Sequence, residues 1–167
     1  MSRPLIMSFR PDACELCLDG RKRRTRRIWK PEWHAAAAHP AREIVSIYHV
    51  PTGRVLWEVG EPITIKPSRT AKGSGQVMCT GLRRERVQDI TEEEALLEGV
   101  CVPGTHRYHG AGYWIDTPCP TFVMSACDAF RRVWRSLYPS GPRSWDENPE
   151  VAVIEFEPTG GAATKEK

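Results

Sequence analysis

The stretch DGRKRRTRRIWK, residues 19–30, decides how the rest of the chain is interpreted. Cations outnumber every other residue type in it, and no acid follows Asp19 until Glu32. Because like charges repel, such a run persists where it meets an anion or where crowded positive charge serves chemistry. Solvated faces, localisation signals and loose phosphate contacts are the ordinary uses of a basic run, and they stay open here.

Residues on both sides place this run inside a fold. A short helical pattern over residues 12–19 ends at Gly20, directly before the run. Ile28 and Trp29 close the run with apolar bulk. We therefore expect an ordered segment and not a solvated tail.

Residues 21–27 of this run contain one lysine and one hydroxyl, in the spacing Lys22-x-x-Thr25. Neighbouring arginines favour the neutral amine of Lys22, which can then act as a base. A threonine hydroxyl needs such a base to become a nucleophile. Arginine cannot take this role because it stays protonated. Lys22 and Thr25 are thus candidates for nucleophilic catalysis.

Length and composition predict one domain. The chain has 167 residues, with 24 Lys and Arg against 21 Asp and Glu, so its net charge is only +3 and its basic character is local. We expect a single domain over residues 1–158 and a flexible tail over 159–167. No apolar stretch is long enough for a membrane span and no signal-peptide pattern is present, so we expect a cytoplasmic protein with six reduced cysteines.

Short β-rich segments separated by Gly and Pro predict a mostly β fold. The expected strands are residues 4–9, 44–50, 54–59, 63–66, 77–82 and 151–156. A helix is expected over 126–138 with Phe130, Val133, Trp134 and Leu137 on its buried face. Residues 31–40 are expected to form a small surface helix or loop.

Two cysteines in the helical pattern, Cys14 and Cys17, allow a metal or redox interpretation. No second Cys-x-x-Cys completes a zinc site, so we expect both to face the core as small apolar side chains. A Gly- and Pro-rich loop holds four further ligand types, Cys101, His106, His109 and Cys119, whose spacings match no standard metal site. The same loop carries Tyr108, Tyr113 and Trp114, which would serve as a base-stacking platform for RNA.

A second helix start is signalled after the middle of the chain. Thr91 followed by Glu94 forms a capping box, and Gly99 ends the helix. Glu98 is the exception, because an acid in the last turn opposes the helix dipole. That cost is only a few tenths of a kcal/mol, so it is a weak indication that Glu98 has another task, with an ordinary surface position as the alternative.

Three blocks in this order resemble one family. They are GRKRRTRR at 20–27, RRERVQDITEEEA at 83–95 with Glu98-Gly99, and WDENP at 145–149 leading into VIEF at 153–156. Together they look like an ASCH domain, in the variety common in bacteriophages and prophages. The resemblance covers most of residues 4–157 and implies an α+β fold of the PUA-like kind, a small, mostly antiparallel β-barrel with flanking helices.

The family is generally regarded as RNA-associated, and some small bacterial members hydrolyse the amide of N4-acetylcytidine with a lysine, a threonine nucleophile and a glutamate. Carried over, those residues fall on Lys22, Thr25 and Glu98. The mechanism this implies has Lys22 take the proton of Thr25, which attacks the amide carbonyl, while Glu98 orients Lys22 or protonates the leaving amine. No metal or other cofactor is implied.

The cations expected to bind RNA or a modified nucleoside are Arg21, Arg23, Arg24, Arg26, Arg27, Lys66 and Arg69. Residues 31–50 and 101–125 have no counterpart in the short amidohydrolases and are expected to be insertions. Arginine also replaces the smaller residues around their threonine, which favours a longer, anionic ligand such as RNA. The alternatives are a non-catalytic RNA-binding module and a phage protein that contacts a host component.

Overall fold

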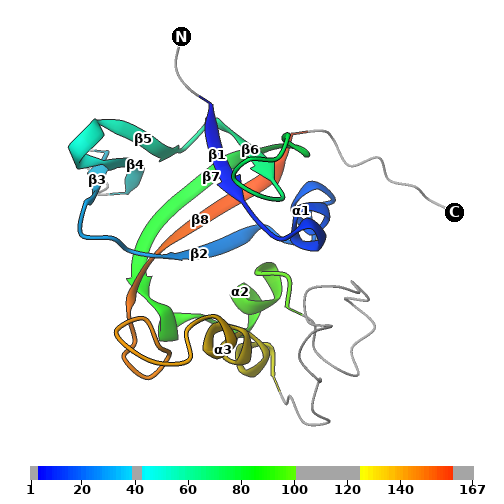
Figure 1. Cartoon of the computed structure of the whole chain (residues 1–167), viewed down its shortest axis with the longest axis vertical. Coiled ribbons are helices and arrows are strands. Elements are labelled where there is room, and N and C mark those ends of the chain that lie inside the picture. The colour runs from blue at the N-terminus through cyan, green and yellow to red at the C-terminus, as the bar shows by residue number, and fades with distance from the viewer. Residues whose placement is uncertain (1–3, 39–42, 101–124, 160–167) are drawn as a thin grey trace, which may run out of the picture.

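A computed structural model describes residues 4–38, 43–100 and 125–159, and eight strands in it form one mixed sheet (Figure 1). The strands are β1 (Leu5–Ser8), β2 (Arg24–Ile28), β3 (Trp33–Ala37), β4 (Ile44–His49), β5 (Arg54–Glu58), β6 (Pro62–Lys66), β7 (Gly75–Arg86) and β8 (Glu150–Pro158). The helices are α1 (Pro11–Leu18), α2 (Glu92–Leu97) and α3 (Ala126–Leu137), with short 3₁₀ turns at Val50–Thr52 and Val87–Asp89.

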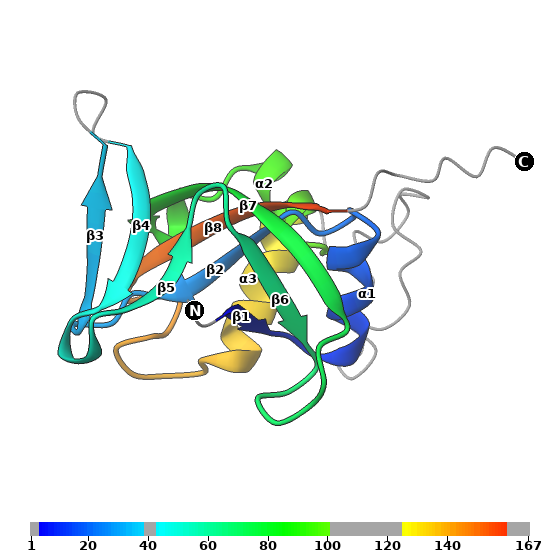
Figure 2. The same cartoon turned by 90° about the horizontal axis from the view of Figure 1, so that it is seen from above.

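The long strand β7 organises the sheet. It pairs antiparallel with β8 along one edge and with β6 and then β4 along the other. β2 continues the sheet beyond β8, β1 lies parallel to β6, and β3 and β5 flank β4. Figure 2 shows β3, β4 and β5 at one end of the molecule and α1 at the other.

Side chains of β8 supply two hydrophobic cores on opposite faces of the sheet. Ala152, Ile154 and Phe156 join the core on the α1 side, whereas Val151 and Val153 join the core under α2 and α3. All five are nearly or fully buried, as a strand covered on both faces requires. The side chain of a residue that pairs with β8 therefore lies on the same face of the sheet as the side chain of its β8 partner.

The α+β class and the mostly antiparallel pairing agree with expectation, but the sheet is not closed into a barrel, contrary to the barrel we expected. β1 pairs only with β6, and β5 pairs only with β4. Because β1 and β5 do not pair with each other, the sheet stays open. None of the helices in the described part of the chain is long and apolar enough to cross a membrane.

Two local predictions were wrong. Residues 33–37 form the strand β3 and not a helix or loop, because they pair with β4 once the Trp33 ring packs edge-on against Trp57 at 5.2 Å. Leu137 is 61% exposed, since it ends α3 beyond the part that the sheet covers. The prediction for Cys14 and Cys17 is confirmed, because both lie in the α1-side core and burial raises the pKa of the Cys17 thiol to about 12.

Candidate functional site

A buried lysine lies at the centre of the candidate site. The chain turns at Gly20, whose φ is +81°, and the Lys22 amide then donates to the Leu16 carbonyl at 2.8 Å. This places Lys22 at the junction of α1 and β2 with only 1% of the residue exposed. Its Nζ donates to the Glu98 carboxylate at 2.8 Å and to the Glu98 backbone carbonyl at 2.6 Å.

Helix α2 delivers Glu98 to that position. The capping box is present: the Thr91 hydroxyl accepts from the Glu94 amide, and the Glu94 carboxylate accepts from the Thr91 amide, both at 3.2 Å. Glu98 is the C-cap, and Gly99 follows with φ of +82°. The acid that opposes the helix dipole is 4% exposed and paired with Lys22, which accounts for its unfavourable place in the helix.

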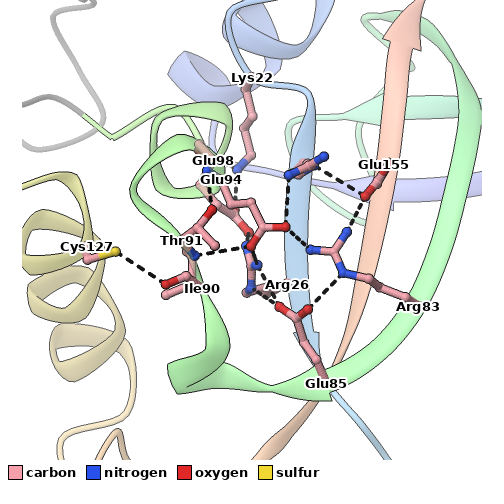
Figure 3. Close-up of polar contacts among 11 residues, drawn as sticks. Lys22, Arg26, Arg83, Glu85, Ile90, Thr91, Glu94, Glu98, Cys127 and Glu155 are labelled. Atoms are coloured by element: carbon pink, nitrogen blue, oxygen red, sulfur yellow. Dashed lines mark hydrogen bonds and ion pairs between the residues drawn. The ribbon is translucent and has the colours of Figure 1, made fainter.

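Arg26 binds the other carboxylate oxygen of Glu98. Its side chain is 0% exposed, and Nη1 lies 3.0 Å from Glu98 Oε1. The same guanidinium contacts Glu85 at 2.7 Å and Glu94 at 2.8 Å (Figure 3). Burial would lower the pKa of Arg26, but the Glu98, Glu85 and Glu94 carboxylates outweigh it and raise that pKa.

Two further arginines surround this centre. Arg83 binds Glu85, Glu94 and Glu155, and Arg24 lies 2.9 Å from Glu94 and 3.4 Å from Glu155. Burial acts to raise the pKa of Glu94, yet the Thr91 amide and the three arginines lower it overall. We call the set of Lys22, Arg24, Arg26, Arg83, Glu85, Glu94, Glu98 and Glu155 the ion cluster.

Thr25 faces away from most of this cluster. On β2, Thr25 pairs with Ile154 and Arg27 with Ala152, so both side chains lie on the α1 side of the sheet. Arg26 pairs with Val153 and lies on the α2 and α3 side. Thr25 is 5% exposed, and its hydroxyl makes no hydrogen bond to Lys22 within the described residues.

The Phe9 ring connects Lys22 with the Thr25 face. The Lys22 ammonium lies 5.7 Å from the centre of this ring, and the Arg27 guanidinium lies 5.0 Å from it. Thr25 lies between these two cations in the chain and on the same face as Arg27. The candidate nucleophile Thr25 is therefore flanked in the chain by two cations that both contact the Phe9 ring.

The remaining predicted binding residues are spread over different surroundings. Arg21 pairs with Asp19, and the hydrogen bond between them raises the pKa of Arg21. Arg23 is exposed and donates to the Gly20 carbonyl at 2.9 Å. Lys66 at the end of β6 and Arg69 in the loop after it contact none of the ion cluster among the described residues.

One electrostatic expectation needs correction. We expected Arg21, Arg23 and Arg24 to crowd Lys22 with positive charge, but Arg21 and Arg24 pair with their own acids and Arg23 turns to solvent. The nearest charge to Lys22 is the carboxylate of Glu98. The run is stable because its anions come from the protein itself, chiefly from α2 and β7.

Sequence reasoning missed the parts of the ion cluster outside the run, which are Arg83, Glu85, Glu94 and Glu155. A usable signal was RRER at 83–86, where Arg83 and Glu85 are two residues apart and so lie on one face of a strand. Phe9 was read only as part of a first strand. Groups of His, Cys, Asp and Glu arranged for a metal are absent from the described residues, and the Cys101, His106, His109 and Cys119 set lies outside them, as do Tyr108, Tyr113 and Trp114.

Comparisons with known proteins give two similar solved structures. Protein EF3133 from Enterococcus faecalis V583, described with the family DUF984, is 13% identical, with 94% of this chain and 80% of that chain covered and a TM-score of 0.49. An ASCH domain from Lactobacillus crispatus JV V101 is 14% identical, with 86% and 68% covered and a TM-score of 0.43. No family model and no curated protein matches the chain.

Proposed function

We propose that this protein is an ASCH-type hydrolase that cleaves the acyl amide of a modified nucleoside such as N4-acetylcytidine. The observation that carries the proposal is Lys22, an amine that is 1% exposed and hydrogen-bonded to both the side chain and the backbone of Glu98. Burying such a pair is costly and seldom improves stability over apolar residues of the same size. Buried, paired ionisable groups beside a nucleophile are frequent in active sites.

Each residue has one role in the proposed reaction. Glu98 orients Lys22, and the neutral amine of Lys22 accepts the hydroxyl proton of Thr25. Thr25 Oγ1 bonds to the carbonyl carbon, the carbon–nitrogen bond breaks, and the Lys22 ammonium returns the proton to the leaving amine. Water then cleaves the threonine ester, which releases the carboxylic acid and restores the hydroxyl.

Chromatography of nucleosides tests the proposal directly. Purified protein is incubated with N4-acetylcytidine and related acylated nucleosides, and free cytidine is measured. We expect product from the wild type and none from Thr25→Ala. Lys22→Met should be inactive as well, and combining it with Glu98→Gln leaves no unpaired buried charge, so that loss of activity can be separated from loss of folding.

The control is Arg135→Gln, which breaks an ion pair with Asp146 whose side chains are 51% and 74% exposed. It should keep wild-type turnover. Absence of turnover by the wild type on all of these nucleosides would remove the amidohydrolase function.

Non-catalytic RNA binding is the second candidate, and exposed cations near one end of the sheet support it. Arg23, Arg69 and Lys72 are all exposed, and none of them forms an ion pair within the described residues. Charged side chains of this kind position a phosphate backbone without reading its sequence. A cytoplasmic, phage-encoded protein that acts on host RNA or on a host component is consistent with either candidate.

A further inference from the structure

Arg27 differs from the other two arginines of β2, Arg24 and Arg26, because it binds no carboxylate among the described residues. Nη2 donates to the Ser8 carbonyl at 2.7 Å, and the guanidinium lies over the Phe9 ring. Its other N–H groups have no partner among the described residues, and the side chain is partly exposed. Arg26, by contrast, donates hydrogen bonds to three carboxylates.

We infer that Arg27, which lies over the Phe9 ring, recognises a ring acceptor of a planar base whose acyl amide lies at Thr25. This inference rests on the proposed function and adds the group that selects its substrate. A partly buried guanidinium with unused donors makes strong hydrogen bonds to an acceptor that replaces water. Since Arg27 shares its face of β2 with Thr25, such an acceptor and the reacting carbonyl are reached from the same side of the sheet.

The spacing of the two residues sets the shape of the ligand. Residues two apart on a strand are separated by about 6.6 Å, so the acceptor and the scissile carbonyl lie roughly one ring width apart. A pyrimidine with an acylated amine at C4 and a carbonyl at C2, both on one edge of the ring, offers an amide and an acceptor at about this separation. An acylated aromatic amine without a ring acceptor has the same scissile bond but offers nothing to Arg27.

Phe9 fixes the direction of the guanidinium. Its ring is near both Lys22 and Arg27 and packs against Phe156, with ring centres 6.3 Å apart. The Ser8 carbonyl, one residue before Phe9, anchors Arg27 from the side. The Ser8 carbonyl and the Phe9 ring therefore both restrain the Arg27 guanidinium.

The test compares N4-acetylcytosine with acetanilide, which has the same acetyl amide on a ring without an acceptor. We expect the wild type to favour N4-acetylcytosine. Arg27→Gln should raise KM for it by roughly 10- to 100-fold, as expected for loss of a hydrogen bond to a charged group. The same change should leave the rate of acetanilide hydrolysis within about two-fold, because the acetanilide ring has no acceptor for Arg27.

Two further variants complete the design. Arg54→Gln, at an exposed position on β5, should leave both substrates unchanged. Arg27→Lys keeps the charge over Phe9 but loses the planar fork, so it should fall between wild type and Arg27→Gln, and it decides the matter if Arg27→Gln does not fold.

Wild-type activity with the same substrate preference in a folded Arg27 variant would overturn this inference and leave the proposed function standing. Inactivity of the wild type on both substrates and on the acylated nucleosides would overturn both.

Discussion

Replacing Arg26 by methionine should destabilise the protein more than any exposed ion pair can explain. The side chain is fully buried and is shared by Glu85, Glu94 and Glu98, which are 14%, 14% and 5% exposed. Arg26→Met removes the cation and leaves three carboxylates facing one another. Removing one partner of a buried pair costs about 3–5 kcal/mol, because the remaining charge is left uncompensated. For a chain of this size that corresponds to a decrease in Tm of roughly 6–20 °C.

The assay is urea unfolding at pH 7 and again near pH 4.5, with Arg135→Met as the exposed control. The Arg135–Asp146 pair is 51% and 74% exposed, so its loss should cost at most about 1 kcal/mol. Without Arg26, the three carboxylates keep only Lys22, Arg24 and Arg83 as partners, and the cluster carries a net negative charge. Protonation of a carboxylate relieves this charge, so the deficit of Arg26→Met should shrink as the pH falls. Equal costs for the two variants at pH 7 would refute the claim that Arg26 neutralises the buried carboxylates.

The wild type should show the opposite dependence on pH. The pKa of Glu94 is lowered in the folded state, so Glu94 contributes stability above its unfolded value of about 4.3. That contribution is lost as the pH falls through the lower folded pKa. An unfolding free energy that rises on acidification from pH 5 to pH 3 would contradict this.

Two other measurements probe the same site. Gly99→Ala should cost about 1–2 kcal/mol and disturb the Lys22–Glu98 pair, because φ is +82° and the added Cβ would meet Lys22 Cβ at 3.3 Å. Gly141→Ala, with φ of +83° and open space around it, is the control that carries only the backbone cost and should leave activity intact. Binding of single-stranded RNA, followed by fluorescence anisotropy, should have a salt slope of roughly −2.8, at about −0.7 for each of the available cations Arg23, Arg27, Arg69 and Lys72. A slope of roughly −5.6, as for Arg69 and Lys72 together with all six cations of residues 21–27, would contradict the pairing.

Most of the strands and the helix starts were predictable from the sequence. The capping box at Thr91 predicted where α2 begins, and the hairpin across Thr52 and Gly53 was found from its turn residues. Residues 33–37 were not predictable, because an alanine-rich segment has little intrinsic β preference and pairs only through the contact of Trp33 with Trp57.

Of the candidate site, the sequence indicated single residues but not their partners. Glu98 was noticed because an acid in a last helical turn is unfavourable, and Lys22 because it is the one lysine among the arginines of the run. The contact between them spans 76 residues, and no local pattern carries such a pairing. For the same reason the arginines were interpreted as free cations, although carboxylates distant in the sequence neutralise Arg24 and Arg26.

The net charge of the ion cluster limits the kind of substrate that it can bind. Lys22, Arg24, Arg26 and Arg83 are four cations, and Glu85, Glu94, Glu98 and Glu155 are four carboxylates, so the cluster is neutral as a whole. A phosphate that approached these arginines would have to displace carboxylates already held at 2.7–3.0 Å around Arg26. An uncharged nucleoside displaces none of them. Arg24 and Arg26 therefore serve to neutralise carboxylates of the protein itself. Arg27 is left as the cation of β2 best placed to contact a ligand.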